Sequence, residues 1–284
     1  MKPGKYSKQK KRLPFWYYAA VVLLTGVFVF SGWYLIDYFA VANRQADVYE
    51  DLASMVDSHK SDIHADQPGE TMVIDGDFEM MVPTPVENLR NADGILLEYA
   101  QLYEMNPDVA GWICIEGTKI NYPVMHTPDR ANYYLKRDFY GAYSSWGCIY
   151  AREECDLELP SDNVTLYGHN MKDGSMFAAL NDYGKKEFWK QHPYIRFDTI
   201  REHHTYAIFA VFTTTASQGL GFEYHAFVDA AEEQAFAEFI ETCLALSLYD
   251  TGIVPAYGDK IICLSTCEYT QTNGRLVVAA VRMD

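Results

Sequence analysis

Lys260-Ile261-Ile262-Cys263-Leu264-Ser265-Thr266-Cys267 is an apolar run that predicts a buried strand, and Arg275 to Arg282 forms a second such run just downstream. Six further runs of the same kind lie upstream, each bounded by turn residues. They are Gly111 to Ile115, Ile120 to Met125, Gly147 to Tyr150, Val164 to Tyr167, Tyr194 to Asp198 and Thr205 to Thr214. Eight runs of this kind predict a mainly β protein with a closed or nearly closed barrel.

Two helices are expected to accompany the barrel. Residues 229–248 carry apolar side chains at helical spacing and acidic residues near the start, where they favour the helix dipole. This helix is inserted before the penultimate strand. A shorter amphipathic pattern covers residues 95–103 and ends before Pro107.

The N-terminus has the composition of a membrane anchor. Residues 13–36 contain no charged side chain, and a helix of 24 residues rises about 36 Å, more than the roughly 30 Å of a hydrocarbon core. A cleaved signal peptide is the alternative, because Ala40-Val41-Ala42 resembles a cleavage site. A retained helix is favoured, since the span exceeds a signal h-region of about 7 to 15 residues and has aromatic residues at both ends.

Charge and spacing divide the chain into four segments. Residues 1–12 hold six basic side chains and no acid, so we expect a cytoplasmic tail there, a single membrane helix at 13–36 and an exterior position for the rest. Residues 37–92 are expected to form an extracellular stalk and linker, helical up to about Lys60 and with a short strand near 71–74. Residues 93–284 are expected to form the globular domain.

The acidic balance excludes several classes of partner and cofactor. The formal net charge is −16, and the residues after the basic tail carry −22, so a nucleic-acid backbone would be repelled. The six cysteines show neither the spacing of a small disulfide framework nor a C-x-x-C pair for zinc. We expect no cofactor and no metal site.

Three residues with the chemistry of nucleophilic catalysis stand at the ends of strand-like runs. Cys267 ends one run, Arg275 begins the next, and His169 follows Thr165-Leu166-Tyr167-Gly168. A free thiol has a pKa of about 8.5, so it needs a nearby His or Arg to favour the thiolate, and Arg can also stabilise an oxyanion. Each residue alone has an ordinary structural interpretation, and only the combination indicates a cysteine nucleophile.

These motifs resemble the sortase family of cysteine transpeptidases, and class B within it. The family pattern at the nucleophile is Thr-Leu-x-Thr-Cys with a downstream Arg, and Leu264, Thr266, Cys267 and Arg275 match it, whereas Cys263 replaces the first Thr. The stretches Leu166 to Asn170, Gly174 to Phe177, Gly111 to Ile113 and Asn121 to Val124 also look like class B. The resemblance runs from about Asn106 to the end.

The resemblance implies an eight-stranded sortase β-barrel with N-terminal helices, and it makes residues 93–284 a sortase catalytic domain. It implies that the Cys267 thiolate attacks a Thr carbonyl in a C-terminal sorting signal, with His169 as acid and base and Arg275 at the oxyanion. A peptidoglycan amine then takes the acyl group from the thioester and joins the surface protein to the wall. Residues flanking the pair would line the peptide groove: Leu166, Tyr167, Ser265 and Thr266, with a further wall at Leu220 to Tyr224.

Two other functions compete with this interpretation. Ser145-Trp146-Gly147-Cys148-Ile149-Tyr150, with His126 upstream, resembles the nucleophile motif of L,D-transpeptidases, but Tyr150 stands where that family has Arg. A non-catalytic membrane-anchored binding module is the second alternative, and it predicts that the Cys, His and Arg side chains need not approach one another.

Overall fold

The computed structural model describes residues 15–60, 71–74, 78–81, 89–217, 219–268 and 273–283. The chain divides into two compact units, Met1–Ala46 and Asp47–Asp284. The first unit contains the N-terminal part of helix α1 (Phe15–Lys60), and the second contains the barrel and every other element.

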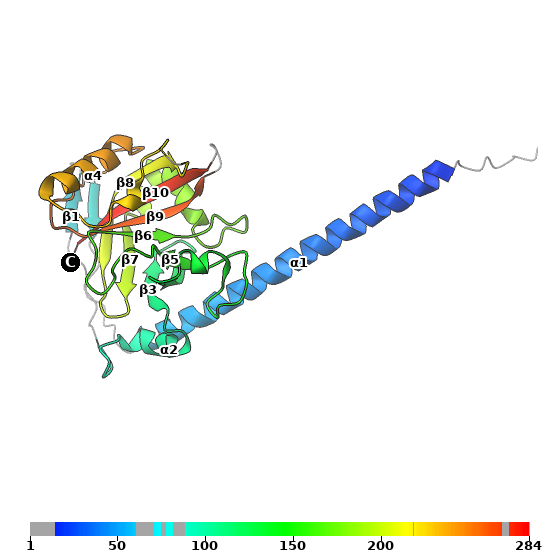
Figure 1. Ribbon diagram of the computed structural model, residues 1–284, viewed down its shortest axis with the longest axis horizontal. Helices are drawn as coiled ribbons and strands as arrows, with labels where there is room; N and C mark the ends of the chain where they lie inside the picture. Colours follow the sequence, from blue (N-terminus) through cyan, green and yellow to red (C-terminus); the bar gives the residue numbers. More distant parts are fainter. Residues whose placement is uncertain are drawn as a thin grey trace, which may run out of the picture. The chain divides into compact units, whose positions relative to one another are not determined.

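The second unit is built on a closed barrel of eight strands in the order β10-β8-β7-β3-β4-β5-β6-β9 (Figure 1). Each strand falls on one of the eight predicted runs, so the prediction of an eight-stranded barrel is confirmed. The strands are β3 (Val109–Cys114), β4 (Asn121–Met125), β5 (Ile149–Ala151), β6 (Asn163–Tyr167), β7 (Tyr194–Thr199), β8 (Thr205–Thr215), β9 (Ile261–Glu268) and β10 (Gly274–Arg282).

Six of the eight strand pairs are antiparallel, and two are parallel. The parallel pairs are β4 with β5 and β6 with β9. A parallel pair needs a long connection, and the one from β6 to β9 contains η2 (Ala178–Gly184), α3 (Lys186–Gln191), β7, β8, η3 (Tyr224–Ala226) and α4 (Glu233–Leu246). The 3-10 helix η1 (Tyr133–Lys136) lies in the β4–β5 connection.

Helix α4 covers one side of the barrel through its apolar stripe. Its buried residues Phe236, Phe239, Ile240 and Cys243 recur at helical spacing and pack with buried side chains of β8, β9 and β10. Burying side chains of this size stabilises the fold by roughly 1.5–3 kcal/mol each. The helix expected before the penultimate strand is therefore present, with bounds narrower than the predicted pattern.

Helix α2 (Leu97–Met105) docks on the barrel through both apolar and charged side chains. Tyr99 and Leu102 are fully buried, and the helix ends before Pro107 as predicted. The Tyr99 hydroxyl donates to Asp198 Oδ2 at 2.5 Å, and the ring of His203 lies between Glu98 and Asp198. The interface between α2 and the β7–β8 hairpin is thus partly ionic although it is buried.

Helix α1 belongs to both units. Its stretch Phe15–Asp57 is long and apolar enough to cross a membrane. Beyond Ala46 the helix enters the second unit, where Tyr49, Leu52 and Val56 are buried. The second compact unit therefore starts at Asp47, before the domain boundary predicted at residue 93. The apolar side chains that recur with helical spacing in the expected stalk are buried in this unit. A short hairpin of β1 (Thr71–Ile74) and β2 (Phe78–Met81) follows the helix.

Candidate active site

Cys267 and Arg275 face each other across two neighbouring strands. They are direct partners in the antiparallel register of β9 and β10. Side chains of directly opposed residues lie on the same face of a sheet, with Cβ atoms about 5 Å apart. The pairing of the two strands therefore places Cys267 and Arg275 side by side on one face. The Arg275 Nη1 donates to the Gly274 carbonyl at 3.0 Å, which holds the side chain near the start of β10.

The parallel pairing of β6 with β9 brings His169 to the same place. The pairing ends at Tyr167 and Ser265, and three further hydrogen bonds continue it past the strand ends. The Gly168 N–H donates to the Ser265 carbonyl at 3.1 Å, Thr266 Oγ1 donates to the Gly168 carbonyl at 2.8 Å, and Asn170 Nδ2 donates to the Cys267 carbonyl at 2.9 Å. His169 is therefore held near Cys267 by hydrogen bonds of the residues on both sides of it.

Gly168 is required for this close approach. A Cβ at Gly168 would lie 2.5 Å from Ile149 Cδ1 and 2.6 Å from the ring of Phe177. Such contacts are closer than real side chains allow, and both neighbours are fully buried. The Gly before the His therefore lets the loop pass over the floor of the site, which places the imidazole at the strand end.

One hydrogen bond orients the imidazole of His169. Its Nε2 lies 2.7 Å from the carbonyl oxygen of Leu135 in η1. Because a carbonyl only accepts, Nε2 carries the hydrogen, and Nδ1 is the nitrogen that can accept a proton in the neutral ring. The imidazole of His169 therefore has a defined tautomer, as a general base requires.

All three predicted catalytic residues line one cavity of about 310 Å³. The walls include Tyr167, Ser265 and Thr266, three of the four residues predicted to contact substrate. The side chains of Ser265 and Thr266 are nearly closed to solvent, with the Ser265 Oγ 2.6 Å from the Tyr224 hydroxyl. These two residues contribute to the cavity mainly by fixing its shape.

Leu166, the fourth residue predicted to contact substrate, is placed differently from the other three. Its side chain is fully buried, and it is not among the residues that line the cavity. Successive residues of a strand point to opposite faces, so Leu166 turns away from the face to which Tyr167 contributes. β6 lies between β5 and β9, and its first four residues, Leu166 included, are buried, so adjacency to the histidine along the chain does not make a residue accessible.

Several wall residues carried no signal in the sequence. Arg152 hydrogen-bonds to Tyr167 and pairs with Glu154 at 2.7 Å. His225 lies in the same wall, and burial, followed by the charge of Arg152, lowers its pKa. These residues come from loops after β5 and β8, where no period or motif marks them. Tyr224 fell at the end of the predicted further wall and does line the cavity.

The other cysteines are poor candidates for a nucleophile. All six are free, and only Cys114 and Cys267 are partly exposed. Burial raises the pKa of Cys148 to about 12, although the Tyr49 hydroxyl, which donates to its sulfur at 3.4 Å, acts in the opposite direction. Such a thiol stays protonated at neutral pH. The L,D-transpeptidase interpretation, which needs Cys148 as the nucleophile, is therefore not supported.

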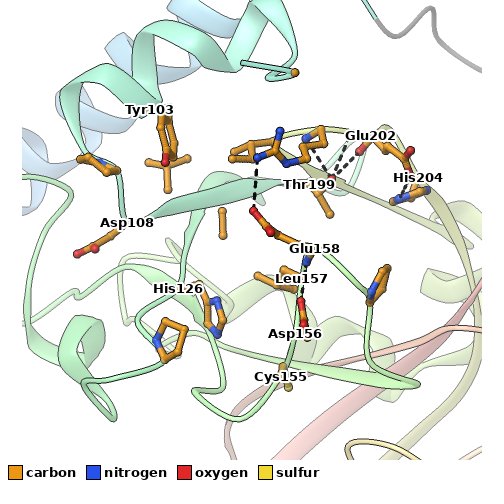
Figure 2. Close-up of a pocket in the computed structure, with 18 of the residues that line it drawn as sticks. Tyr103, Asp108, His126, Cys155, Asp156, Leu157, Glu158, Thr199, Glu202 and His204 are labelled. Carbon is orange, nitrogen blue, oxygen red and sulfur yellow. Dashed lines mark hydrogen bonds and ion pairs between the residues drawn. The ribbon is translucent and has the colours of Figure 1, made fainter. Parts of the chain in front are cut away.

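A second cavity, of about 740 Å³, is lined in part by the β5–β6 connection (Figure 2). Figure 2 shows Tyr103, His126, Asp156 and Glu202 around it, contributed by different segments of the chain. It shares Glu153 with the smaller cavity, but Cys267, His169 and Arg275 are not among its described lining residues. Its one thiol, Cys155, is buried, and burial raises its pKa to about 11. The three predicted catalytic residues therefore line the smaller cavity and not this one.

A thiol, an imidazole and a guanidinium at one rim of a β-barrel define a cysteine acyl-transfer enzyme. Comparison with known proteins gives the family. The sortase domain profile matches residues 113–283. Sortase B of Staphylococcus aureus is 30% identical over 205 residues, which cover 72% of this chain and 79% of that protein. Sortase B of Listeria monocytogenes is 32% identical over 183 residues, which cover 64% and 72%.

Solved structures agree with the sequence comparison. Sortase B from B. anthracis in complex with AAEK1 aligns with a TM-score of 0.68 and 27% identity, covering 87% of this chain and 99% of that one. A Staphylococcus aureus sortase B–substrate complex aligns with a TM-score of 0.68 and 25% identity, covering 85% and 97%. The chain belongs to the sortase family. It is a cysteine transpeptidase of the kind that anchors surface proteins to the cell wall, and the interpretation as a non-catalytic binding module is excluded.

Proposed function

We propose that Cys267, His169 and Arg275 are the catalytic residues and that they join a sorting-signal protein to a peptidoglycan amine. The observation that carries the proposal is the shared cavity at the ends of β6, β9 and β10, into which all three residues converge. Each has a distinct chemical task there, and the hydrogen bonds around Gly168 and Asn170 support their positions.

In the first half-reaction the sulfur of Cys267 attacks the carbonyl carbon of a Thr residue in the sorting signal, and its proton passes to His169 Nδ1. The carbonyl oxygen becomes an oxyanion, to which Arg275 donates. The C–N bond then breaks, and His169 returns the proton to the leaving amine. The products are a thioester on Cys267 and the released C-terminal peptide.

In the second half-reaction an amine of the cell wall attacks the thioester carbonyl. His169 Nδ1 takes one proton from the amine, and Arg275 again donates to the oxyanion. The C–S bond breaks, Cys267 recovers its proton, and an amide joins the surface protein to the wall. Water in place of the amine gives hydrolysis, so the two nucleophiles compete for the same intermediate.

The walls of the cavity are proposed to hold the sorting peptide in an extended form. Tyr167 and Thr266 flank the catalytic pair, and Arg152, Tyr224 and His225 also line the cavity. Arg152 is held by Tyr167 and Glu154, so its guanidinium is a fixed donor to peptide carbonyls. Ser265 supports Tyr224 through their hydroxyl contact.

The enzyme is proposed to be anchored by α1, with residues 1–12 in the cytoplasm and the barrel outside. The length and composition of the span support the anchor, and the six basic residues before it support the orientation. The proposed acceptor and the sorting signal both lie on that outer side.

The test uses the full chain in detergent micelles with a library of sorting-signal peptides and an amine acceptor. We expect cleavage after Thr, a mass increase on Cys267 equal to the N-terminal fragment, and an amide product only when the amine is present. Cys267→Ala should abolish all three signals. Cys114→Ala is the matched control, because Cys114 is the other partly exposed cysteine and lies outside the cavity. Acylation of another residue, or activity in Cys267→Ala, would refute the assignment.

A further inference from the structure

The part of α1 that belongs to the barrel unit contacts a residue that lines the catalytic cavity. Tyr49 is 5% exposed, and its hydroxyl donates to the Gly147 carbonyl at 2.8 Å. The same oxygen lies 3.4 Å from the sulfur of Cys148, a residue that lines the catalytic cavity. The Tyr49 ring packs edge-on against Tyr122 with centroids 5.2 Å apart. Tyr49 therefore has a fixed position under the site.

Gly147 transmits this contact to the segment around η1. Its φ is +60°, and a Cβ there would lie 2.5 Å from the Leu135 carbonyl oxygen and 2.8 Å from that of Tyr134. The next residue, Cys148, donates its N–H to the Tyr134 carbonyl at 3.0 Å. The backbone at residues 147–148 is therefore pressed directly against the two carbonyls of residues 134–135.

The second of these carbonyls is the one that orients the catalytic imidazole. Leu135 O accepts the hydrogen bond from His169 Nε2 at 2.7 Å. Gly147 packs closely against the Leu135 carbonyl, since even a Cβ added at Gly147 would lie only 2.5 Å from that oxygen, so a displacement of Gly147 toward it would move the carbonyl. That movement would rotate the imidazole and change the direction of Nδ1.

We propose that Tyr49 is a positioning residue that holds His169 in its reactive orientation through Gly147 and Leu135. The proposal rests on the role of His169 given under Proposed function. Tyr49 touches neither the nucleophile nor the substrate cavity directly, so its effect is on the chemical step and not on peptide binding. The helix that leads out of the membrane thus supplies a residue on which catalysis depends.

Tyr49→Phe tests the proposal, because it removes the hydroxyl and keeps the packing against Tyr122. Loss of the donor leaves the buried Gly147 carbonyl unpaired, so the backbone at 147–148 relaxes. We expect kcat to fall about 10- to 100-fold, as small misplacements of catalytic groups do, with KM for the peptide unchanged. In the ¹⁵N spectrum of histidine-labelled full-length protein in micelles, we expect the His169 Nε2–H to exchange faster with water than in wild type.

Tyr183→Phe is the matched control. Tyr183 is also fully buried, and its hydroxyl donates to a backbone carbonyl, that of His192, at 2.8 Å, but it lies outside the catalytic cavity. It should lower stability by a similar amount while kcat and the His169 signal stay at wild-type values. Equal losses of kcat in both variants, or a wild-type His169 signal in Tyr49→Phe, would overturn the proposal.

Two tyrosine analogues at position 49 separate the effect of the hydrogen-bond donor from that of side-chain volume. They also provide the test if Tyr49→Phe does not fold. Substitution by 4-aminophenylalanine keeps an N–H donor at the same place, and substitution by 4-methylphenylalanine keeps the volume without the donor. We expect the amino analogue to restore kcat and the His169 signal, and the methyl analogue not to. Equal behaviour of the two would overturn the proposal. Absence of any turnover in wild type would instead count against the proposed function, since the NMR signal reports the position of His169 without substrate.

Discussion

The buried charge cluster between α2 and the β7–β8 hairpin makes stability depend on pH in a definite direction. His203 is 7% exposed at its side chain, with Nε2 3.0 Å from Glu98 Oε1 and Nδ1 3.0 Å from Asp198 Oδ2. Arg196 and Tyr99 also face Asp198. Burial acts to lower the pKa of His203, but the hydrogen bonds and charges of Asp198 and Glu98 outweigh it and raise the pKa to about 9.

The magnitude follows from linkage. The pKa is about 6.5 in an unfolded chain and about 9 in the folded one, and each pKa unit corresponds to about 1.4 kcal/mol. His203 therefore contributes about 3 kcal/mol to the free energy of unfolding below pH 6.5. Because the folded pKa is the higher one, this contribution is lost as pH rises through about 9. For a unit of this size, about 3 kcal/mol lowers the melting temperature by roughly 6–12 °C.

The assay is a series of thermal melts between pH 6 and 10 for wild type and His203→Gln. The difference in stability between the two should shrink by about 3 kcal/mol across this range, because the variant cannot carry the charge. His126→Gln is the control. Burial lowers the pKa of His126, so this residue changes the free energy of unfolding only at acidic pH. Its replacement should leave unchanged the loss of stability between pH 6.5 and 10. A difference between wild type and His203→Gln that is constant with pH would refute the reasoning.

Three further results are expected. Arg275→Lys should lower turnover about 10²- to 10³-fold, the usual effect of losing one oxyanion donor, with little change in melting temperature; near-normal turnover would show that charge alone suffices. Gly168→Ala should abolish turnover in a protein that still folds, because its Cβ would meet Phe177 and Ile149 at about 2.5 Å; an active variant would contradict the close approach. Protease added outside intact cells should degrade the chain after Asp37 and spare a tag before Lys2, and protection of the C-terminal domain would contradict the orientation.

Much of the fold could be predicted because its signals are local. The apolar runs that became β8, β9 and β10 are nearly continuous, as expected of strands covered on both faces. The helical spacing in α4 predicted its buried stripe for the same reason. The three proposed catalytic residues were recognisable because their motifs are short, and each motif stands at a strand end.

Other features could not be predicted from the sequence, because neighbours along the chain need not share a surface. Leu166 is adjacent to Tyr167, yet strand alternation separates their side chains, and only the packing around β6 shows which one reaches the cavity. Residues 47–57 have the helical period of a stalk, and nothing in that period distinguishes a free helix from one that packs on the barrel. The contact from Tyr49 to Gly147 spans 98 residues and carried no sequence signal.

The sequence by itself determined which segments are strands and helices, which segment can cross a membrane, and which side chains have the chemistry for acyl transfer. Only the tertiary structure decided that these side chains meet. The bond between Asn170 and Cys267 joins residues 97 positions apart, and it depends on the parallel pairing of β6 with β9. Backbone preferences act over a few residues, whereas such pairing depends on how the whole barrel closes, because each strand's partner is fixed only when the other strands have occupied their places.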